Sequence, residues 1–199
     1  MFISFEGIDG SGKSTQARRL ARALNDAGTE TLLTREPGGS QGAEEIRRLL
    51  VEGRGERWSP ETELLLFTAA RRDHVERLIG PTLARGASVI TDRFADSSRV
   101  YQGLVRADLR DLVEELHRLT IGIEPDRTFL IDIDPEIALA RGQARGGVED
   151  RFEGLGLDFQ RRLRDGFLAL AAEFPARFRI MDGHGSEDEV AARVKAALA

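Results

Sequence analysis

One pattern near the N-terminus constrains the fold more than any other feature of the sequence. Residues 7–14, GIDGSGKS, match the spacing G-x-x-x-x-G-K-[ST]; they follow the apolar stretch Met1–Phe5 and precede a segment with helical spacing, Ser14–Ala27. Glycines in such a loop let backbone N–H groups converge on phosphate oxygens, and the start of a helix adds its positive end. The pattern predicts a strand, a phosphate-binding loop and a helix. A glycine-rich turn that merely caps a helix is the alternative.

Two residues of the loop carry side-chain chemistry. The chain has 29 lysines and arginines, but only Lys13 and Lys195 are lysine. The compact ammonium of Lys13 suits a point between two phosphates, where the flat fork of arginine does not fit. The hydroxyl of Ser14 can bind Mg²⁺. We expect the loop and the residue after it to bind ATP, that is Gly7, Ile8, Asp9, Gly10, Ser11, Gly12, Lys13, Ser14 and Thr15.

Asp92 is the second candidate for a metal site. It ends the stretch ASVITD, where proteins with this kind of loop place an acid that orients Mg²⁺, usually through water. A helix cap and an ion pair with Arg93 are the alternatives. The chain has no cysteine and only three histidines, so a bound metal is expected to have oxygen ligands.

Apolar and helical segments alternate along the chain. Five stretches predict buried parallel strands, the last two more weakly: Met1–Phe5, Ala87–Thr91, Thr128–Ile133, Thr29–Thr34 and Phe178–Met181. Segments with helical spacing lie between them: Ser14–Ala27, Pro60–Ile79, Leu109–Leu119 and Phe159–Phe174. The alternation predicts an α/β fold with a five-stranded parallel sheet flanked by helices. With no repeat or linker, residues 1–199 are expected to form a single domain.

Composition excludes several classes of protein. Hydrophobic residues are 41% and charged residues 32%, as in ordinary globular proteins. No apolar run is long enough to cross a bilayer, and the first residues carry neither a basic segment nor a cleavage site. The formal charge of −5 argues against a protein that coats nucleic acid. We therefore expect a cytoplasmic protein that binds neither membrane nor nucleic acid.

A phosphate loop does not distinguish a kinase from a GTPase switch or a motor ATPase, so other segments must decide. Three blocks follow the loop in order: Thr34–Gly39 (TREPGG), Asp92–Phe94 leading into Asp96–Gly103 (DSSRVYQG), and Asp150–Glu153 (DRFE). Together with the loop they resemble thymidylate kinase, from Phe5 to about Phe174. Val100 departs from the alanine usual in the family, which should affect packing more than chemistry.

The resemblance implies a three-layer P-loop kinase fold, a homodimer, and an Mg²⁺-dependent transfer of the γ-phosphate of ATP to thymidine monophosphate, giving thymidine diphosphate and ADP. It also implies an acceptor site made of Asp9, Arg35, Glu36, Pro37, Arg47, Phe67, Arg71, Arg93, Ser97, Ser98, Tyr101 and Gln102. The family keeps a cis proline at the turn beneath the acceptor, so the Glu36–Pro37 peptide is expected to be cis.

Within this implied site, each residue type suits its role. The guanidinium groups of the three arginines Arg35, Arg47 and Arg93 suit phosphate oxygens. Phe67 matches the side chain that stacks on thymine, and Arg71 lies on the same helical face, placed to donate to a base oxygen.

The remaining matches rest on the resemblance. Ser98 and Gln102 match contacts to the base edge, Tyr101 matches an aromatic residue that closes on the sugar, and Asp9 and Glu36 match acids facing the acceptor. Three alternatives stay open: an ion pair of Arg47 with Glu44, core packing of Phe67, and a helix cap by Ser97.

Catalytic arginines are expected on a closing segment. Residues 8–11 contain no base, whereas Arg141, Arg145 and Arg151 cluster in the glycine-rich segment near 141–156, so the chain resembles the family members that supply arginine from a lid. The catalytic residues are therefore expected to be Lys13, Arg93, Arg151, Arg145 and Arg141. Surface pairs of the lid arginines with Glu149, Asp150 and Glu153 are the alternative.

Two other functions compete with this reading. One is a kinase for another nucleotide or deoxynucleoside, which would lack a pyrimidine site formed by Phe67, Arg71, Ser98 and Gln102. The other is an ATPase switch, which would hydrolyse ATP without an acceptor. No general base is expected, because an acceptor phosphate is already an anion and can attack directly.

Overall fold

The computed structural model describes residues 1–52, 57–106, 108–145 and 156–198, and its centre is one sheet of five parallel strands. The strand order is β2-β3-β1-β4-β5. The strands are β1 (Phe2–Glu6), β2 (Thr31–Arg35), β3 (Ser88–Asp92), β4 (Arg127–Asp132) and β5 (Phe178–Asp182). The predicted α/β class and five-stranded parallel sheet are confirmed, including the two strands with the weaker signal.

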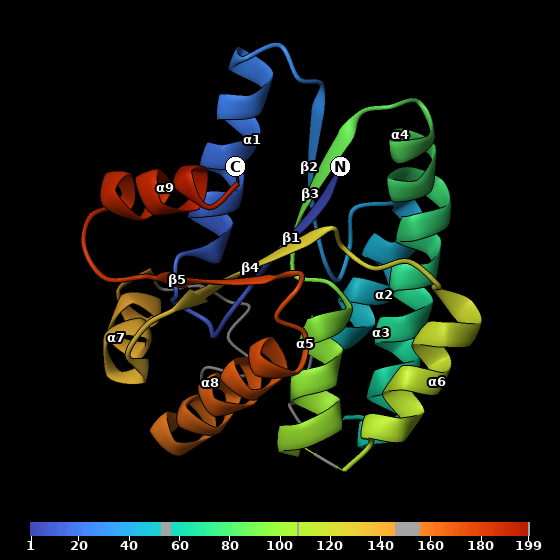
Figure 1. Cartoon of the computed structure of the whole chain (residues 1–199). Helices are drawn as coiled ribbons and strands as arrows, with labels where there is room; N and C mark the ends of the chain where they lie inside the picture. Colours follow the sequence, from blue (N-terminus) through green and yellow to red (C-terminus); the bar gives the residue numbers. More distant parts are fainter. Residues whose placement is uncertain (53–56, 107, 146–155, 199) are drawn as a thin grey trace.

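Helices cover both faces of the sheet. Helices α1 and α9 lie on one side, and α5 and α8 lie on the other (Figure 1). The α-helices are α1 (Lys13–Asp26), α2 (Gln41–Val51), α3 (Pro60–His74), α4 (Gly80–Ala84), α5 (Ala95–Val100), α6 (Arg110–Thr120), α7 (Pro135–Arg145), α8 (Gly156–Glu173) and α9 (Glu187–Ala196). In the described ranges, no helix is both long and apolar enough to span a membrane.

The helix predicted over Pro60–Ile79 differs in one detail. It is α-helical as far as His74 and continues as a π-helical turn, η1 (Val75–Ile79), before α4. Pro81 in the first turn of α4 has no N–H, and its ring would clash with the carbonyl four residues earlier in a regular helix. The wider turn lies directly before this proline. A second π-helical segment, η2 (Tyr101–Arg106), extends α5.

The central strands are buried on both faces, as a parallel sheet between helices requires. Alternate side chains Ile3 and Phe5 of β1 pack with Phe129 of β4 against α1 and α9. On the opposite face, which α5 covers, β1 carries two polar residues, Ser4 and Glu6, and both are fully buried. This face therefore needs hydrogen-bond partners as well as apolar contacts.

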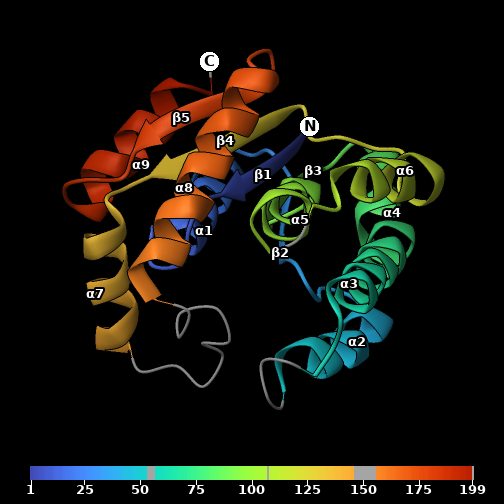
Figure 2. The same cartoon turned by 90° about the horizontal axis from the view of Figure 1, so that it is seen from below.

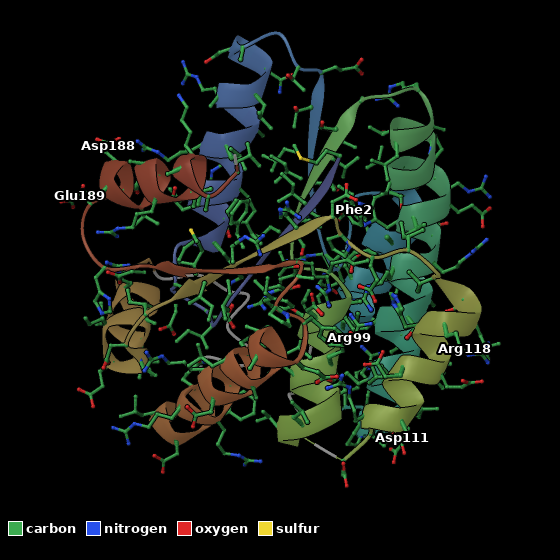
Figure 3. The ribbon with its side chains drawn as sticks, in the orientation of Figure 1. Phe2, Arg99, Asp111, Arg118, Asp188 and Glu189 are labelled. Atoms are coloured by element: carbon green, nitrogen blue, oxygen red, sulfur yellow. The ribbon has the colours of Figure 1, made fainter. Side chains whose placement is uncertain are left out.

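A buried polar network fixes α5 on that face. Arg99 donates to Asp96 on its own helix, to Glu114 on α6 and to Glu124 just before β4. Arg177 donates with both terminal nitrogens to Asp96. Figure 3 shows Arg99 in the interior, whereas Asp188 and Glu189 lie on the outer surface of α9. The network joins α5 to α6 and to the segments just before β4 and β5, and so sets the direction in which its side chains point.

The carboxyl ends of the strands define one edge of the molecule. Parallel strands bring the segments that follow β1, β2 and β3 together at that edge, which is where ligands bind in open α/β sheets. Figure 2, which views the molecule from below, shows α3, α5, α7 and α8 arranged around the end of β1.

Candidate active site

The phosphate loop connects β1 to α1 as predicted. Gly12, directly before α1, has φ 96°, in the left-handed region that favours glycine. Gly10 has φ 80° and lies so close to α7 that an added Cβ would overlap the carbonyl of Ala138. Lys13 begins α1 with only 6% of its surface exposed, and its Nζ donates to the carbonyl of Ile8 (3.4 Å). The loop is thus closely packed and carries a buried ammonium.

Asp9 joins the loop to the other side of the site. Its Oδ1 accepts from Lys13 Nζ (3.2 Å) and from Arg93 Nη2 (2.7 Å), and Tyr101 OH donates to its Oδ2 (3.4 Å). Burial raises the pKa of Asp9, but Arg93 and Lys13 outweigh it and hold the pKa well below its usual range. Asp9 is therefore ionised at neutral pH and holds two cations side by side.

Arg93 follows β3 in a conformation unusual for its residue type. Its φ is 71°, and among the described residues it is the only non-glycine residue with a positive φ. Its guanidinium donates to Ser97 Oγ (2.9 Å) and Tyr101 OH (3.2 Å) besides Asp9. Ser97 does not cap a helix: α5 begins at Ala95 after Phe94, without a side-chain cap. The alternative role for Ser97 is wrong, because its hydroxyl is engaged with other partners.

Arg71 is the best-held side chain of the expected base site. It is 5% exposed, and its Nε donates to Glu36 Oε2 (2.6 Å). Its Nη2 donates to Ser98 Oγ (3.1 Å) and to the carbonyl of Phe94 (3.2 Å). To the residues that the structure describes, Nη1 makes no hydrogen bond. One edge of this guanidinium therefore remains for a ligand.

A second layer of residues holds this arginine. His74 Nδ1 is 3.0 Å from Glu36 Oε1, and its Nε2 is 2.8 Å from Thr34 Oγ1. Burial raises the pKa of Glu36, but Arg71 and His74 together lower it below its ordinary value. Another residue of the expected base site, Gln102, is held separately: its Nε2 donates to Glu63 Oε1 (2.8 Å) on α3. Phe67, half-buried, lies one helical turn before Arg71.

The turn after β2 brings two further arginines to the site. The Glu36–Pro37 peptide is cis, as predicted. Arg47 Nη1 donates to the carbonyl of Pro37 (2.7 Å). Glu44, the alternative partner of Arg47, instead lies 3.1 Å from Arg35 and accepts the N–H of Gly39 (2.9 Å). Arg35 is exposed.

Two expected metal ligands have oxygen atoms suited to a hard cation. Ser14 lies in the first turn of α1 and is half-buried. Asp92 Oδ1 is buried, and it has no hydrogen-bond partner in the described part of the chain. Asp92 is not the N-cap of α5, so that alternative is wrong. In the same ranges no three acidic or histidine side chains gather as a metal cage.

The expected lid lies largely beyond what the structure describes. Arg141 is half-buried on α7 and has no hydrogen bond or ion pair to described residues. Arg145 is the last residue of α7, but its side chain is outside the described part. Arg151, with the block Asp150–Glu153, falls in residues 146–155, also outside it.

Several supporting residues were not predicted from the sequence. Glu63 and His74 share the α3 face of Phe67 and Arg71, at helical spacing, which is a signal that the sequence contains. Thr34 carries no such signal. Glu6, a charged residue at the end of an apolar strand, stands out in the sequence, but its partners are on a distant segment.

Comparisons with known proteins agree with this geometry. The family model described as thymidylate kinase matches residues 5–194. A thymidylate kinase of Dinoroseobacter shibae is 69% identical over 196 residues, covering 98% of this chain and 95% of that protein. One from Ruegeria pomeroyi is 63% identical over 194 residues, covering 98% and 92%. The crystal structure of thymidylate kinase from Ehrlichia chaffeensis superposes with a TM-score of 0.83 at 35% identity, covering 100% of this chain and 98% of that one. The chain therefore belongs to the thymidylate kinase family of nucleoside monophosphate kinases, with the P-loop kinase fold of that family.

Proposed function

We propose that this chain transfers the γ-phosphate of ATP to thymidine monophosphate in the cytoplasm, giving thymidine diphosphate and ADP, and that the residues described above carry out the transfer. One observation supports the proposal most directly. A single carboxylate oxygen, Asp9 Oδ1, is bonded both to Lys13 of the phosphate loop and to Arg93 of the opposite side. A donor-side cation and an acceptor-side cation are thus neighbours, as direct transfer between two phosphates requires.

On the donor side, the loop backbone from Gly7 to Thr15 binds the ATP phosphates. Its N–H groups and the start of α1 supply fixed positive dipoles. Lys13 moves its ammonium from Asp9 and Ile8 toward the β- and γ-phosphates when ATP is bound. Lys13 and these dipoles stabilise the charge that spreads over the γ-phosphoryl group during transfer.

Ser14 and Asp92 are the residues that would hold Mg²⁺. The buried Oδ1 of Asp92, which has no hydrogen-bond partner among the described residues, would accept from a water of the ion, and the hydroxyl of Ser14, the second residue of α1, would bind the ion beside the loop. Two protein ligands are enough for Mg²⁺, because this ion keeps several of its waters and binds phosphate oxygens of the substrate. When bound, Mg²⁺ neutralises charge on the β- and γ-phosphates.

On the acceptor side, arginines bind the monophosphate. Arg93 is the innermost, Arg35 ends β2, and Arg47 lies on α2 and donates to the carbonyl of Pro37 in the turn between them. Asp9 accepts from the 3′-hydroxyl, with Glu36 as a second acid, and Tyr101 and Ser97 border the sugar and the phosphate.

The base is read from α3 and α5. Phe67 stacks on thymine, and the Nη1 of Arg71, which bonds to none of the described residues, donates to a base carbonyl. Ser98 and Gln102 complete the edge of the base pocket. An arginine can only donate hydrogen bonds, so it rejects the amino group that cytosine presents at that place.

The transfer itself needs no general base. An oxygen of the acceptor phosphate attacks the γ-phosphorus, the bond from that phosphorus to the β–γ bridging oxygen breaks, and ADP leaves. Arg141, Arg145 and Arg151 of the lid add positive charge to the moving group, with Arg151 as the principal contributor.

A panel of acceptors tests the proposal. ADP release from ATP and Mg²⁺ is measured with deoxythymidine, deoxyuridine and deoxycytidine monophosphates, and without an acceptor. We expect kcat/KM to be about 10- to 200-fold lower for deoxyuridine monophosphate, which lacks one methyl group, and on the order of 10⁴-fold lower for the cytidine nucleotide. Release of ADP at the same rate without any acceptor would mean that the chain is an ATPase.

We also propose that the chain forms a homodimer. Helices α3 and α6 lie side by side, joined by a bond from Arg72 to the carbonyl of Thr120, and they expose Leu65, Leu112 and Leu119. A second copy would cover this apolar surface. Light scattering should give twice the chain mass for the wild type and for Ile180→Glu on the sheet edge, and a monomer mass for Leu65→Glu. A monomeric wild type at micromolar concentration contradicts this.

A further inference from the structure

Strand β1 ends on a carboxylate that has no part in the proposed transfer. Glu6 is 0% exposed and directly precedes the phosphate loop. A strand buried on both faces is normally apolar, and a carboxylate in such a place must be compensated by hydrogen bonds or by opposite charge. The partners of its two oxygen atoms show what this carboxylate does.

The first oxygen holds the backbone of Arg93. Glu6 Oε1 accepts the N–H of Phe94 (2.8 Å), and the N–H of Arg93 donates to the carbonyl of Phe5 (2.9 Å). The last two residues of β1 therefore bind the peptide N–H groups on both sides of Arg93. A left-handed conformation at a residue other than glycine persists only where the surroundings over-determine it.

The second oxygen holds the side chain of Arg93 indirectly, through the hydroxyl of Ser97. Glu6 Oε2 accepts from Ser97 Oγ (2.6 Å), and Ser97 Oγ accepts from Arg93 Nη1 (2.9 Å). A serine hydroxyl has one proton, so its donation to Glu6 leaves the oxygen to accept from arginine. Nη1 itself lies 4.0 Å from Glu6 Oε2, outside hydrogen-bond distance.

We infer that Glu6 is the positioning residue of Arg93, fixing both its backbone turn and the direction of its guanidinium toward the acceptor phosphate. The inference rests on the proposed role of Arg93 in binding that phosphate. Because Glu6 acts on the guanidinium through Ser97, it orients the cation without a direct ion pair at hydrogen-bond distance.

The ionisation of Glu6 gives this role a pH signature. Burial and then the charge of Asp96 raise its pKa to about 7, although Arg93 and the bonds from Ser97 and Phe94 lower it. The charged and titratable groups around it are Arg93 from the turn after β3, Asp96 from α5, Tyr101 from the segment that extends α5 and, beyond Arg93, Asp9 of the loop. The positioning carboxylate is therefore ionised above about pH 7 and is lost as the pH falls.

The raised pKa of Glu6 affects folding stability in the opposite direction: the charged form that positions Arg93 is the less stable form in the folded protein. The folded-state pKa lies above the ordinary value of 4.5, so folding takes up a proton at Glu6. Its contribution to stability is full below about pH 4.5 and is lost as the pH rises through about 7. A variant with a neutral residue of the same shape at position 6 should thus be no less stable than the wild type at pH 8. If Glu6 served only for packing, replacing it would lower the stability.

The test uses Glu6→Gln in two backgrounds. Steady-state kcat and KM for both substrates and the melting temperature are measured from pH 6 to pH 9 for the wild type, Glu6→Gln, Arg93→Ala and the double variant. Asp126→Asn is the matched control, because Asp126 accepts the N–H of Phe2 at the opposite end of the same strand (2.7 Å).

We expect Glu6→Gln to lower kcat/KM for the acceptor by about 10- to 100-fold at pH 8, since a small misplacement of a positioned group has effects of that order. Its melting temperature should be unchanged or higher, and the ratio to wild type should shrink toward pH 6. Ionisation of the acceptor phosphate affects both proteins equally, so it cancels in the ratio of their kcat/KM values at each pH. In the Arg93→Ala background, Glu6→Gln should change nothing further.

The outcomes separate the inference from the proposed function. Near-normal activity of Glu6→Gln, or an equal loss with and without Arg93, overturns the positioning role. A loss of activity accompanied by a lower melting temperature at pH 8 also overturns it, because it marks a packing defect. Normal activity of Arg93→Ala overturns instead the proposed role of Arg93.

Discussion

The phosphate loop and the acceptor side of the site meet at Asp9, but in the proposed function they bind phosphate by different means. The loop presents backbone N–H groups and one ammonium, and some of its polar side-chain atoms have no partner. Ser11 Oγ and the neighbouring Asp92 Oδ1 are buried without a hydrogen bond in the described part of the chain. The backbone turn of the loop depends on glycine conformations, such as φ 96° at Gly12.

The acceptor side relies on long side chains that must be held. Arg71 is bonded to Glu36, and Arg93 to Asp9 and, through Ser97, to Glu6. Each of these carboxylates comes from an element other than that of its arginine. An arginine has several rotatable bonds, and fixing it requires partners whose own positions are set by the fold.

This difference has a practical consequence for mutagenesis. Removing the side chain of Lys13 takes away its charge but leaves Asp9 paired, because Asp9 keeps Arg93. Removing an acceptor-side arginine leaves a carboxylate buried with fewer partners. Loss of Lys13 should therefore alter the rate alone, whereas loss of the buried Arg71 should alter both rate and stability.

The largest effect on rate is expected for Lys13→Ala. Loss of the ammonium at the donor phosphates should lower kcat by about 10²- to 10³-fold, with little change in melting temperature. Lys195→Ala, which removes the other lysine from the exposed side of α9, is the control and should behave as wild type. Near-normal turnover of a well-folded Lys13→Ala variant would remove the donor role of Lys13.

Arg71→Ala should affect specificity and stability together. Activity toward thymidine monophosphate should fall far more than activity toward the cytidine nucleotide, so discrimination between them collapses. Because Glu36 loses its main partner, the free energy of unfolding should fall by about 3–5 kcal/mol. Denaturant titration and the acceptor panel measure the two effects.

The neighbouring Arg72→Ala is the matched control for this variant. Arg72 is exposed and bonded to Glu76 and to the carbonyl of Thr120, so it should change stability by no more than about 1 kcal/mol. If Arg71→Ala reduced activity toward both nucleotides by the same factor, Arg71 would have a structural role and the base would be read elsewhere.

Asp92→Asn tests the donor side at the metal. The Mg²⁺ concentration for half-maximal rate should rise by about 10- to 100-fold, as for other groups that orient a metal's ligands. The melting temperature should stay the same, since Asp92 Oδ1 bonds to nothing in the described residues. An Mg²⁺ titration of the rate, with Asp126→Asn as control, decides this; an unchanged Mg²⁺ dependence contradicts the assignment.

The smallest effect is expected for Arg35→Ala. Arg35 is exposed and paired with Glu44, so the free energy of unfolding should change by at most about 1 kcal/mol. Loss of one charged contact to phosphate should raise KM for the acceptor about tenfold. Glu44→Gln frees Arg35 and should not raise KM. A rise in KM for the acceptor in both variants would mean that the Arg35–Glu44 ion pair only stabilises the turn after β2 and that Arg35 does not bind phosphate.

The sequence by itself determined the strand, loop and helix around residues 7–14 and the strands of the sheet. Residues 7–14 act through their own backbone and side chains, so their spacing predicts a phosphate loop wherever a strand and a helix flank them. The three central strands were likewise predictable, because burial on both faces leaves continuous apolar runs, whereas the partly exposed edge strands β2 and β5 gave a weaker signal. The order of the acceptor residues became interpretable only through the resemblance to a known family.

The tertiary structure decided which residues hold the acceptor side. Glu6 and Ser97 are 91 positions apart in the chain, and Glu36 and Arg71 are 35 apart. They meet because β1, β2 and β3 are neighbours in the sheet and α3 packs beside their ends. A local pattern records the conformation of its own backbone, but a contact between distant side chains exists only once the sheet has set the distance and direction between them.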